Sequence, residues 1–204
     1  MAIDLTALAE QAVAFGFSHA GPLDAATLKP RQEVRDMCAA GKCKGYNSSW
    51  ACPPACGTLE EMVAMMSAFK SGLIVQTTAE LEDNFDIEGM RDAADRQREH
   101  FIGFRDILEK QWPGMVALGS GGCRRCDACT WPDAPCRHPE QMVSSMEACG
   151  LVVSDVCADN GIKYYYGPQT LTYTSCYLLE KKYSNFITQV EEMQNQCVAI
   201  CVMT

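Results

Sequence analysis

The chain has 204 residues, of which 48% are hydrophobic and 21% charged, an ordinary balance for a globular protein with one sizeable core. Its formal net charge of −9 at pH 7 opposes binding to a nucleic-acid backbone or to an anionic membrane surface. The N-terminal stretch has no basic start and carries Asp4 and Glu10 within its apolar pattern, so we expect no signal peptide, no membrane span and a cytoplasmic protein.

From the N-terminus, the apolar spacing predicts a helix over residues 5–15 and a short strand over 17–20. Residues 36–57 are rich in Gly, Pro and Cys and are predicted to form a loop. Thr58 then begins a second helix, in which Glu61 completes a capping box. The predicted buried stripe of this helix consists of Leu59, Met62, Val63, Met66 and Phe69.

A buried strand is predicted from Gly72 onward, and the longest helix is predicted over residues 87–111. A further strand over residues 115–118 leads into a segment dense in cysteine. The apolar stripe of the long helix consists of Met90, Ala94, Gln97, Phe101, Phe104 and Leu108.

After that segment, helices are predicted over residues 139–149 and 154–158, a strand over 171–179 and a last helix over 185–196.

The alternation of helices and strands indicates the α/β class. We expect a single layered domain over residues 1–183, with a mixed sheet, helices on its faces and two cysteine-rich cluster-binding loops. Residues 184–204 are expected to form a C-terminal helical tail.

Thirteen cysteines are far more than a core of this size needs for packing. Disulfides are a weak explanation in a protein without a secretion signal, and the odd number weakens it further. Metal ligation is therefore the leading interpretation.

Four of the cysteines follow the spacing C-x2-C-x2-C-x6-C. A loop that wraps a cubane of four irons supplies thiolates at two-residue intervals, whereas structural zinc sites usually pair two C-x2-C knuckles across a longer span. The repeated two-residue spacing therefore favours a [4Fe–4S] cluster over zinc. The predicted ligands are Cys123, Cys126, Cys129 and Cys136.

The residues that flank this motif are candidates to tune a cluster. Gly122 and the glycines before it allow close approach of the backbone, so that amides could donate to cluster sulfurs. A dinucleotide fingerprint is not completed there, because Arg124 stands at its last glycine position. Arg137 and His138 could hydrogen-bond a cluster or donate protons beside it, and the alternative is that they only begin a helix.

An earlier group of four cysteines has the less specific spacing C-x4-C-x8-C-x3-C. A second [4Fe–4S] cluster is the favoured interpretation, with zinc or free thiols as alternatives. Tyr46 and Trp50 could screen this cluster from water or pack in the core. If Cys56 is not a ligand, one iron is open and could bind a substrate as a Lewis acid. The predicted ligands are Cys38, Cys43, Cys52 and Cys56.

The other five cysteines are not assigned to a metal. Cys149, Cys157 and Cys176 are spaced like small buried hydrophobic residues. Cys197 and Cys201 could meet on one face of the predicted tail helix.

Three features outside the motifs are given structural interpretations. His19 is expected in the core and His100 on an exposed, charged helix face. Residues 164–166, three consecutive tyrosines, are expected at the edge of a strand.

The two motifs carry a family resemblance. The residues concerned are Cys43, Tyr46, Trp50, Cys52-Pro53-Pro54, Gly122-Cys123, Cys126, Cys129, the run Pro135 to Glu140 and the run Ser145 to Ala148. With them the sequence resembles a family of predicted metal-binding proteins, a cysteine-rich domain of unknown function of the iron–sulfur type. The resemblance covers most of the chain before the tail. It implies metal binding and a cluster of the kind found in anaerobes, and it names no substrate.

Two classes of function remain. One is an iron–sulfur redox protein with two [4Fe–4S] clusters, which transfers electrons to or within an anaerobic oxidoreductase system. Its partner would be a ferredoxin-like donor or a larger oxidoreductase. The other is a non-catalytic metal-binding protein whose clusters or zinc organise a partner interface. Two clusters within tunnelling reach favour the redox class, and no nucleic-acid or membrane partner is expected.

Overall fold

A four-stranded sheet forms the centre of the computed structural model, which describes residues 3–181. The strand order is β1-β2-β4-β3, and every neighbouring pair is antiparallel. The α/β class is therefore confirmed, with an antiparallel sheet where a mixed one was expected. The strands are β1 (His19–Asp24), β2 (Phe69–Glu80), β3 (Val116–Leu118) and β4 (Thr170–Lys181).

Five α-helices accompany the sheet, and four of them match predicted helices. Local capping explains where three of them begin. The side chains of Asp4 and Asp86 accept hydrogen bonds from the backbone amides of Ala7 and Gly89. The predicted capping box of Thr58 and Glu61 is present. The helices are α1 (Leu5–Phe15), α2 (Gln32–Met37), α3 (Leu59–Ser67), α4 (Ile87–Gln111) and α5 (Val153–Asp159).

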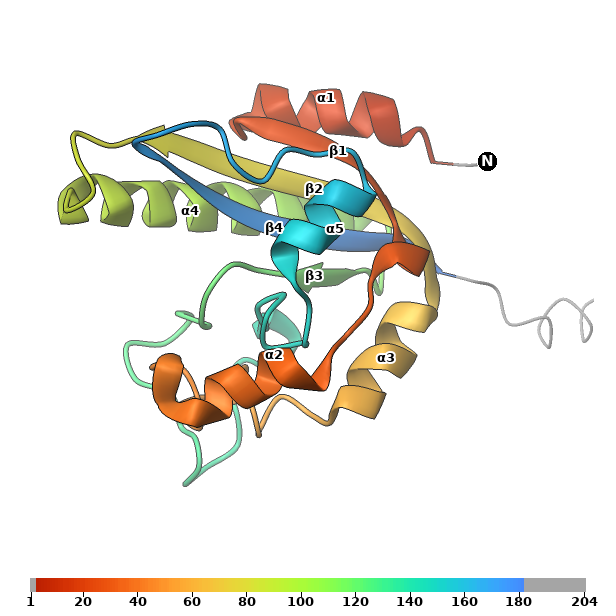
Figure 1. Cartoon of the computed structure of the whole chain (residues 1–204). Coiled ribbons are helices and arrows are strands. Elements are labelled where there is room, and N and C mark those ends of the chain that lie inside the picture. Colours follow the sequence, from red (N-terminus) through yellow and green to blue (C-terminus); the bar gives the residue numbers. More distant parts are fainter. Residues whose placement is uncertain (1–2, 182–204) are drawn as a thin grey trace, which may run out of the picture.

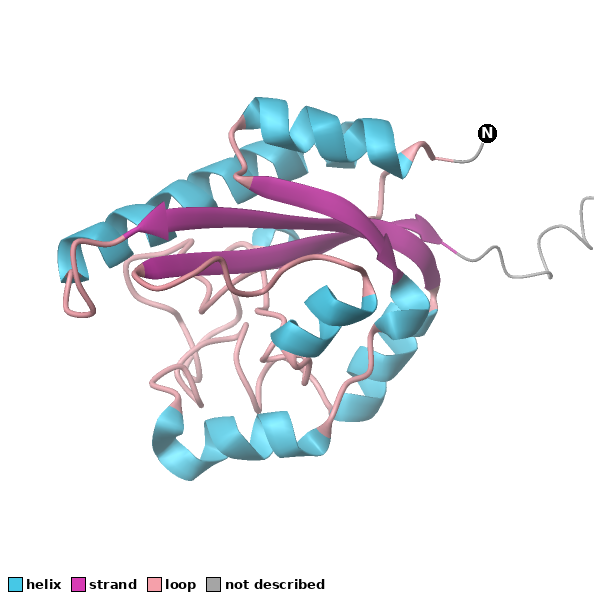
Figure 2. Ribbon diagram, turned by 45° about the horizontal axis from the view of Figure 1, so that its top comes forward, coloured by secondary structure: helices cyan, strands magenta, loops and turns pink. Residues whose placement is uncertain are grey.

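The sheet separates two hydrophobic clusters, because successive strand residues point to opposite faces. Leu73 and Val75 of β2 contact the cluster formed with α1 and α4, whereas Ile74 contributes to the opposite cluster. α1 and α4 cover one face, while α2, α3, α5 and the long loops lie on the other side (Figures 1 and 2). The cysteine-rich segments are therefore held on the face opposite α1.

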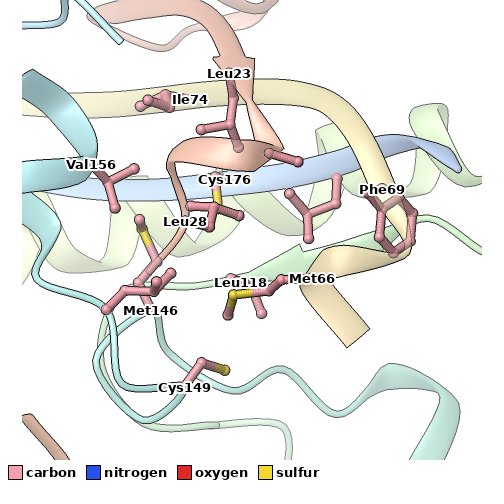
Figure 3. Packing of buried hydrophobic residues seen from close by; sticks show 13 residues of the cluster. Leu23, Leu28, Met66, Phe69, Ile74, Leu118, Met146, Cys149, Val156 and Cys176 are labelled. Atoms are coloured by element: carbon pink, nitrogen blue, oxygen red, sulfur yellow. The ribbon is translucent and has the colours of Figure 1, made fainter. Parts of the chain in front are cut away.

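The loop-side cluster joins the sheet to the segment after the second cysteine motif (Figure 3). Met146 and Cys149 of that segment are completely buried and pack with Leu118 and Cys176 of the sheet. Cys157 is also completely buried. The interpretation of these three cysteines as packing residues is confirmed.

Two predicted segments have a different structure. Residues 36–57 are not a loop throughout, because α2 reaches Met37 and a wide helical turn follows over Cys38–Lys42. This turn is interrupted at Gly41, which has a φ of 78°. The sequence gives no start signal for this helix, because the N-cap residue, Arg31, has no side chain that caps the helix. Cys38 therefore lies on helical backbone.

The predicted helix over residues 139–149 was wrong, apart from a single 3₁₀ turn at Pro139–Gln141. The guanidinium of Arg105 binds the carbonyl groups of Glu140 and Gln141 at 2.8 and 3.3 Å. Ser145 then pairs with Gly119 as an isolated β-bridge. These tertiary contacts use backbone carbonyl groups that a helix would need for its own hydrogen bonds, so the segment adopts a non-helical conformation.

Some predictions for single side chains were also wrong. Val63 of α3 is exposed, and Ala93 rather than Ala94 is fully buried in α4. His100 packs edge-on against Phe15 and Phe17 instead of facing solvent.

The three consecutive tyrosines lie outside the strands. Tyr166 stacks on the half-buried ring of His19 at 4.1 Å and donates to Gln76 at 2.7 Å.

Several predictions for the C-terminal tail lie outside the described residues. They are the domain boundary at 183 and 184, the helix over 185–196, and the pair Cys197 and Cys201. Within residues 3–181, no helix combines the length and apolar character needed to cross a membrane.

The buried thiol and phenol groups of β4 predict a loss of stability at alkaline pH. Burial raises the pKa of Cys176 and Tyr177, so both keep their protons in the folded chain. The unfolded chain releases them above about pH 8.5 and pH 10, so stability should fall by up to about 1.4 kcal/mol per pH unit and group as the pH rises past these values. Thermal unfolding of Cys176→Ala should show a lower melting temperature at pH 7 but a shallower decline above pH 9. A slope equal to that of the parent chain contradicts this.

Candidate metal centre

The two cysteine-rich loops interlock through their tryptophans. The indole N–H of Trp50 donates to the carbonyl of Ala134 at 3.0 Å, and that of Trp131 donates to Asn47 at 2.9 Å. The two indole rings meet edge to face with centroids 4.7 Å apart. Each loop thus fixes the other, and the cysteines of both lie in one region.

All four cysteines of the second motif line one cavity. Its wall also contains Ser49, Trp50 and Ala51 of the first loop. Five further residues between Arg125 and Met142 complete it, and they include the predicted cluster neighbours Arg137 and His138. The structure therefore brings together the residues that the sequence singled out here. The cysteines are Cys123, Cys126, Cys129 and Cys136.

This cavity has a volume of about 30 Å³, room for an ion or a water molecule, so a cubane requires the loop to widen. The backbone offers little resistance to widening. Within the described part of the chain, no amide of residues 120–129 donates a hydrogen bond to a backbone or side-chain oxygen of the protein. These amides, with that of Gly122 among them, are available to a bound group.

Cys129 is the cysteine of this motif whose thiolate is stabilised. Burial opposes ionisation of Cys129, but hydrogen bonds from the backbone of Trp131 and Trp50 outweigh it and lower the pKa, with a smaller contribution from Arg137. A thiolate is the form that ligates metals, so Cys129 is prepared for this role.

In the first loop, Cys43 and Cys52 approach each other around Gly45. Both sulfurs lie within 3.4 Å of the position that a Cβ at residue 45 would occupy, so no other residue fits there without displacing them. The Gly45 amide donates to the sulfur of Cys43 at 3.3 Å. Burial raises the pKa of Cys38 and Cys52, and the charges of neighbouring cysteines add to this. At Cys52 a hydrogen bond from the Ser49 side chain opposes the rise.

The two loops are electrostatically coupled through Cys52. Besides Cys43, the charges of Cys123 and Cys129 contribute to the raised pKa of Cys52. Several thiolates this close are unfavourable without a compensating positive group. A cationic metal provides that compensation.

Cys56, the fourth predicted ligand of the first motif, faces another direction. Its sulfur lies 3.8 Å from the carbonyl oxygen of Ala148 and 3.9 Å from the guanidinium of Arg35. Burial raises its pKa, although the Arg35 charge opposes this.

Arg35 is a site residue that the sequence reasoning missed. Only 8% of its surface is exposed, yet within the described residues no carboxylate pairs with it. One guanidinium nitrogen donates to the carbonyl of Gly57 at 2.7 Å, while Nη1 is buried without a partner. Its position three residues before Cys38, on the same helix, is the one sequence feature that could have indicated it.

The two aromatic residues predicted to screen the first cluster lie in different surroundings. Trp50 lines the cavity of the second motif, whereas Tyr46 is 37% exposed and does not line that cavity. Ser49 lines the same cavity with a buried hydroxyl, and its side chain favours the thiolate of Cys52.

The donor set fits a bound anionic cofactor with a metallic core. Eight thiols gather in two adjoining loops, and beside them the buried Nη1 of Arg35 has no acceptor within the described residues. Within residues 3–181, no group of three or more Cys, His, Asp or Glu side chains is arranged to hold a metal ion. The thiols surround spaces and do not converge on one point.

Comparison with known proteins gives one match. No curated protein and no solved structure matches the chain. The family model described as predicted metal-binding protein (DUF2284) matches residues 21–179, a span that holds both cysteine loops, Arg35 and the whole sheet except the ends of β1 and β4. The chain therefore belongs to this family of predicted metal-binding proteins.

Proposed function

We propose that the protein is an iron–sulfur redox protein with two [4Fe–4S] clusters, one in each cysteine loop, and that it passes electrons to or within an oxidoreductase system. The observation that carries this proposal is the gathering of Cys123, Cys126, Cys129 and Cys136 around one cavity, closed by Trp50 of the other loop. Membership of a predicted metal-binding family supports a metal at this place.

The spacing and the arrangement favour a cluster over a single zinc ion. Zinc takes four ligands at about 2.0–2.3 Å around one point. A cubane is larger and needs thiolates spread around it, with backbone amides to donate to its sulfurs. The second loop offers both features, because its thiols surround a space and the amides of residues 120–129 have no oxygen acceptor in the described part of the chain.

Several residues of the chain would act on the bound clusters. Cys38, Cys43 and Cys52 supply thiolates at the first site, with the buried charge of Arg35 nearby to offset negative charge. The packed indoles of Trp50 and Trp131 exclude water between the loops. When bound, such clusters accept and donate single electrons at potentials that burial and hydrogen bonding tune.

The adjoining position of the loops supports a redox role. Cys52 of the first loop is close enough to Cys123 and Cys129 of the second for their charges to affect its pKa. Clusters held by these residues would be near neighbours and would form a path for electrons. The partner is a ferredoxin-like donor or a larger oxidoreductase.

The proposal is tested by analysis of the whole chain purified without oxygen. About eight irons and eight acid-labile sulfides per chain are expected, with absorbance that dithionite bleaches. Stoichiometric zinc without sulfide would overturn the cluster assignment. Clusters that are present but resist dithionite would overturn the redox role and leave a metal-binding protein that organises an interface.

A further inference from the structure

A second, larger cavity opens where the sheet is incomplete. β3 pairs with β4 only from Val116 to Leu118, opposite Leu178 to Cys176. Beyond this point β4 continues to Thr170 without a further partner on that edge among the described strands. A pocket of about 250 Å³ occupies the space between this bare part of β4, α4 and the loop that follows β3.

The wall of the pocket toward the core is rigid and partly apolar. Phe101 of α4 lines it and is stacked on Tyr177, with ring centroids 4.9 Å apart. Gln97, 1% exposed, is fixed between Thr77 and Ser175 by hydrogen bonds of 2.6 and 2.9 Å. A dry apolar cavity of about 150 Å³ holds benzene, so this pocket has room for a six-membered ring with polar substituents.

The charge of the pocket is opposite to that of the whole chain. Four of the nine arginines line it, together with one acidic residue, Asp106. Arg98 is paired with Asp95 at 3.1 Å, and Arg105 is bound to backbone carbonyl groups. Arg124 has no ion pair among the described residues. The pocket thus concentrates positive charge in a protein whose formal charge is −9.

The backbone adds further donors to this positive charge. Gly121 and Gly122 line the pocket, and a Cβ at either position would find no protein atom within 4 Å, so the space beside them is open. The amides of this loop donate to no protein oxygen within the described residues. Consecutive free amides on glycine-rich backbone form anion-binding concavities.

We propose that this pocket binds a small organic anion, with a ring-sized apolar body against Phe101 and an acidic group between Arg124 and the amides of the glycine loop. Cys123 lines both this pocket and the cavity of the second cysteine motif, so the bound molecule lies next to the candidate metal centre. Its role as an electron acceptor or donor rests on the proposed function. Its binding does not.

Equilibrium dialysis of the anaerobically purified chain against labelled benzoate and benzamide tests the pocket. Benzoate is expected to bind once per chain and at least about tenfold more tightly than benzamide, because a charged hydrogen bond is stronger than a neutral one. Arg124→Gln should weaken benzoate binding about tenfold and leave benzamide binding unchanged. Arg96→Gln is the matched control, because Arg96 is an exposed arginine of α4 that does not line the pocket.

A second variant separates the cavity from the charge. Ala94 lines the pocket on α4, and Ala94→Phe should fill it and abolish the binding of both probes while the iron content stays at the parent level. No benzoate binding by the parent chain, equal binding of benzamide, or an equal loss in Arg96→Gln would each overturn the proposal. Benzoate binding by a chain that contains no iron or sulfide would instead overturn the proposed function and leave the pocket standing.

Discussion

Replacing Cys129 by serine is expected to remove about half of the iron and half of the acid-labile sulfide, because one of two clusters loses a ligand. The backbone of Trp50 and Trp131 lowers the pKa of this thiol, so it is the best-prepared ligand of its motif. A serine hydroxyl is a harder and far less acidic ligand than a thiol, so it replaces a thiolate on cluster iron poorly. Iron, sulfide and electron paramagnetic resonance spectra of the variant measure the loss.

Cys157→Ser is the matched control for this variant. Cys157 is completely buried outside both cysteine loops, and the amide of Gln76 lies 3.7 Å from its sulfur, so a hydroxyl finds a polar neighbour there. This variant should keep its full iron content. Loss of all iron from Cys129→Ser would show that the loops hold one shared centre instead of two.

The sequence predicted α3 and α4 because the information that forms them is local. The capping box of Thr58 and the apolar period of residues 87–111 depend on neighbours in the chain, and both predictions were confirmed. The segment over 139–149 also has helical features. Its conformation is decided by Arg105 and Gly119, which lie far away in the sequence. Tertiary contacts of this kind leave no local pattern.

The same distinction applies to the candidate site. Spacing alone indicated the second motif, and the structure brings its four cysteines to one cavity. The position of Arg35 near Cys38 is the only sequence feature that points to it. Its burial without a carboxylate partner is a property of the folded chain, so its role could not be predicted from the sequence. The interlocking of Trp50 with Trp131 joins positions 81 residues apart in the chain, and neither motif refers to the other.

Cys52→Ser is expected to lose about half of the iron, and Cys56→Ser is expected to retain it. The two cysteines are four positions apart in the chain and both are largely covered, but their sulfurs have different surroundings. The sulfur of Cys52 lies beside that of Cys43 across Gly45, among the other candidate ligands. The sulfur of Cys56 faces the Ala148 carbonyl and the Arg35 guanidinium.

The pair of variants decides how the first cluster is completed. A first cluster held by three thiolates leaves one iron open, and such an iron can bind a substrate atom as a Lewis acid. Retained iron in Cys56→Ser, with spectra like those of the parent chain, supports this open site and places any chemistry at the first loop. Loss of iron equal to that of Cys52→Ser would show that Cys56 is an essential ligand. Both clusters would then be fully ligated, and their role would be limited to carrying electrons.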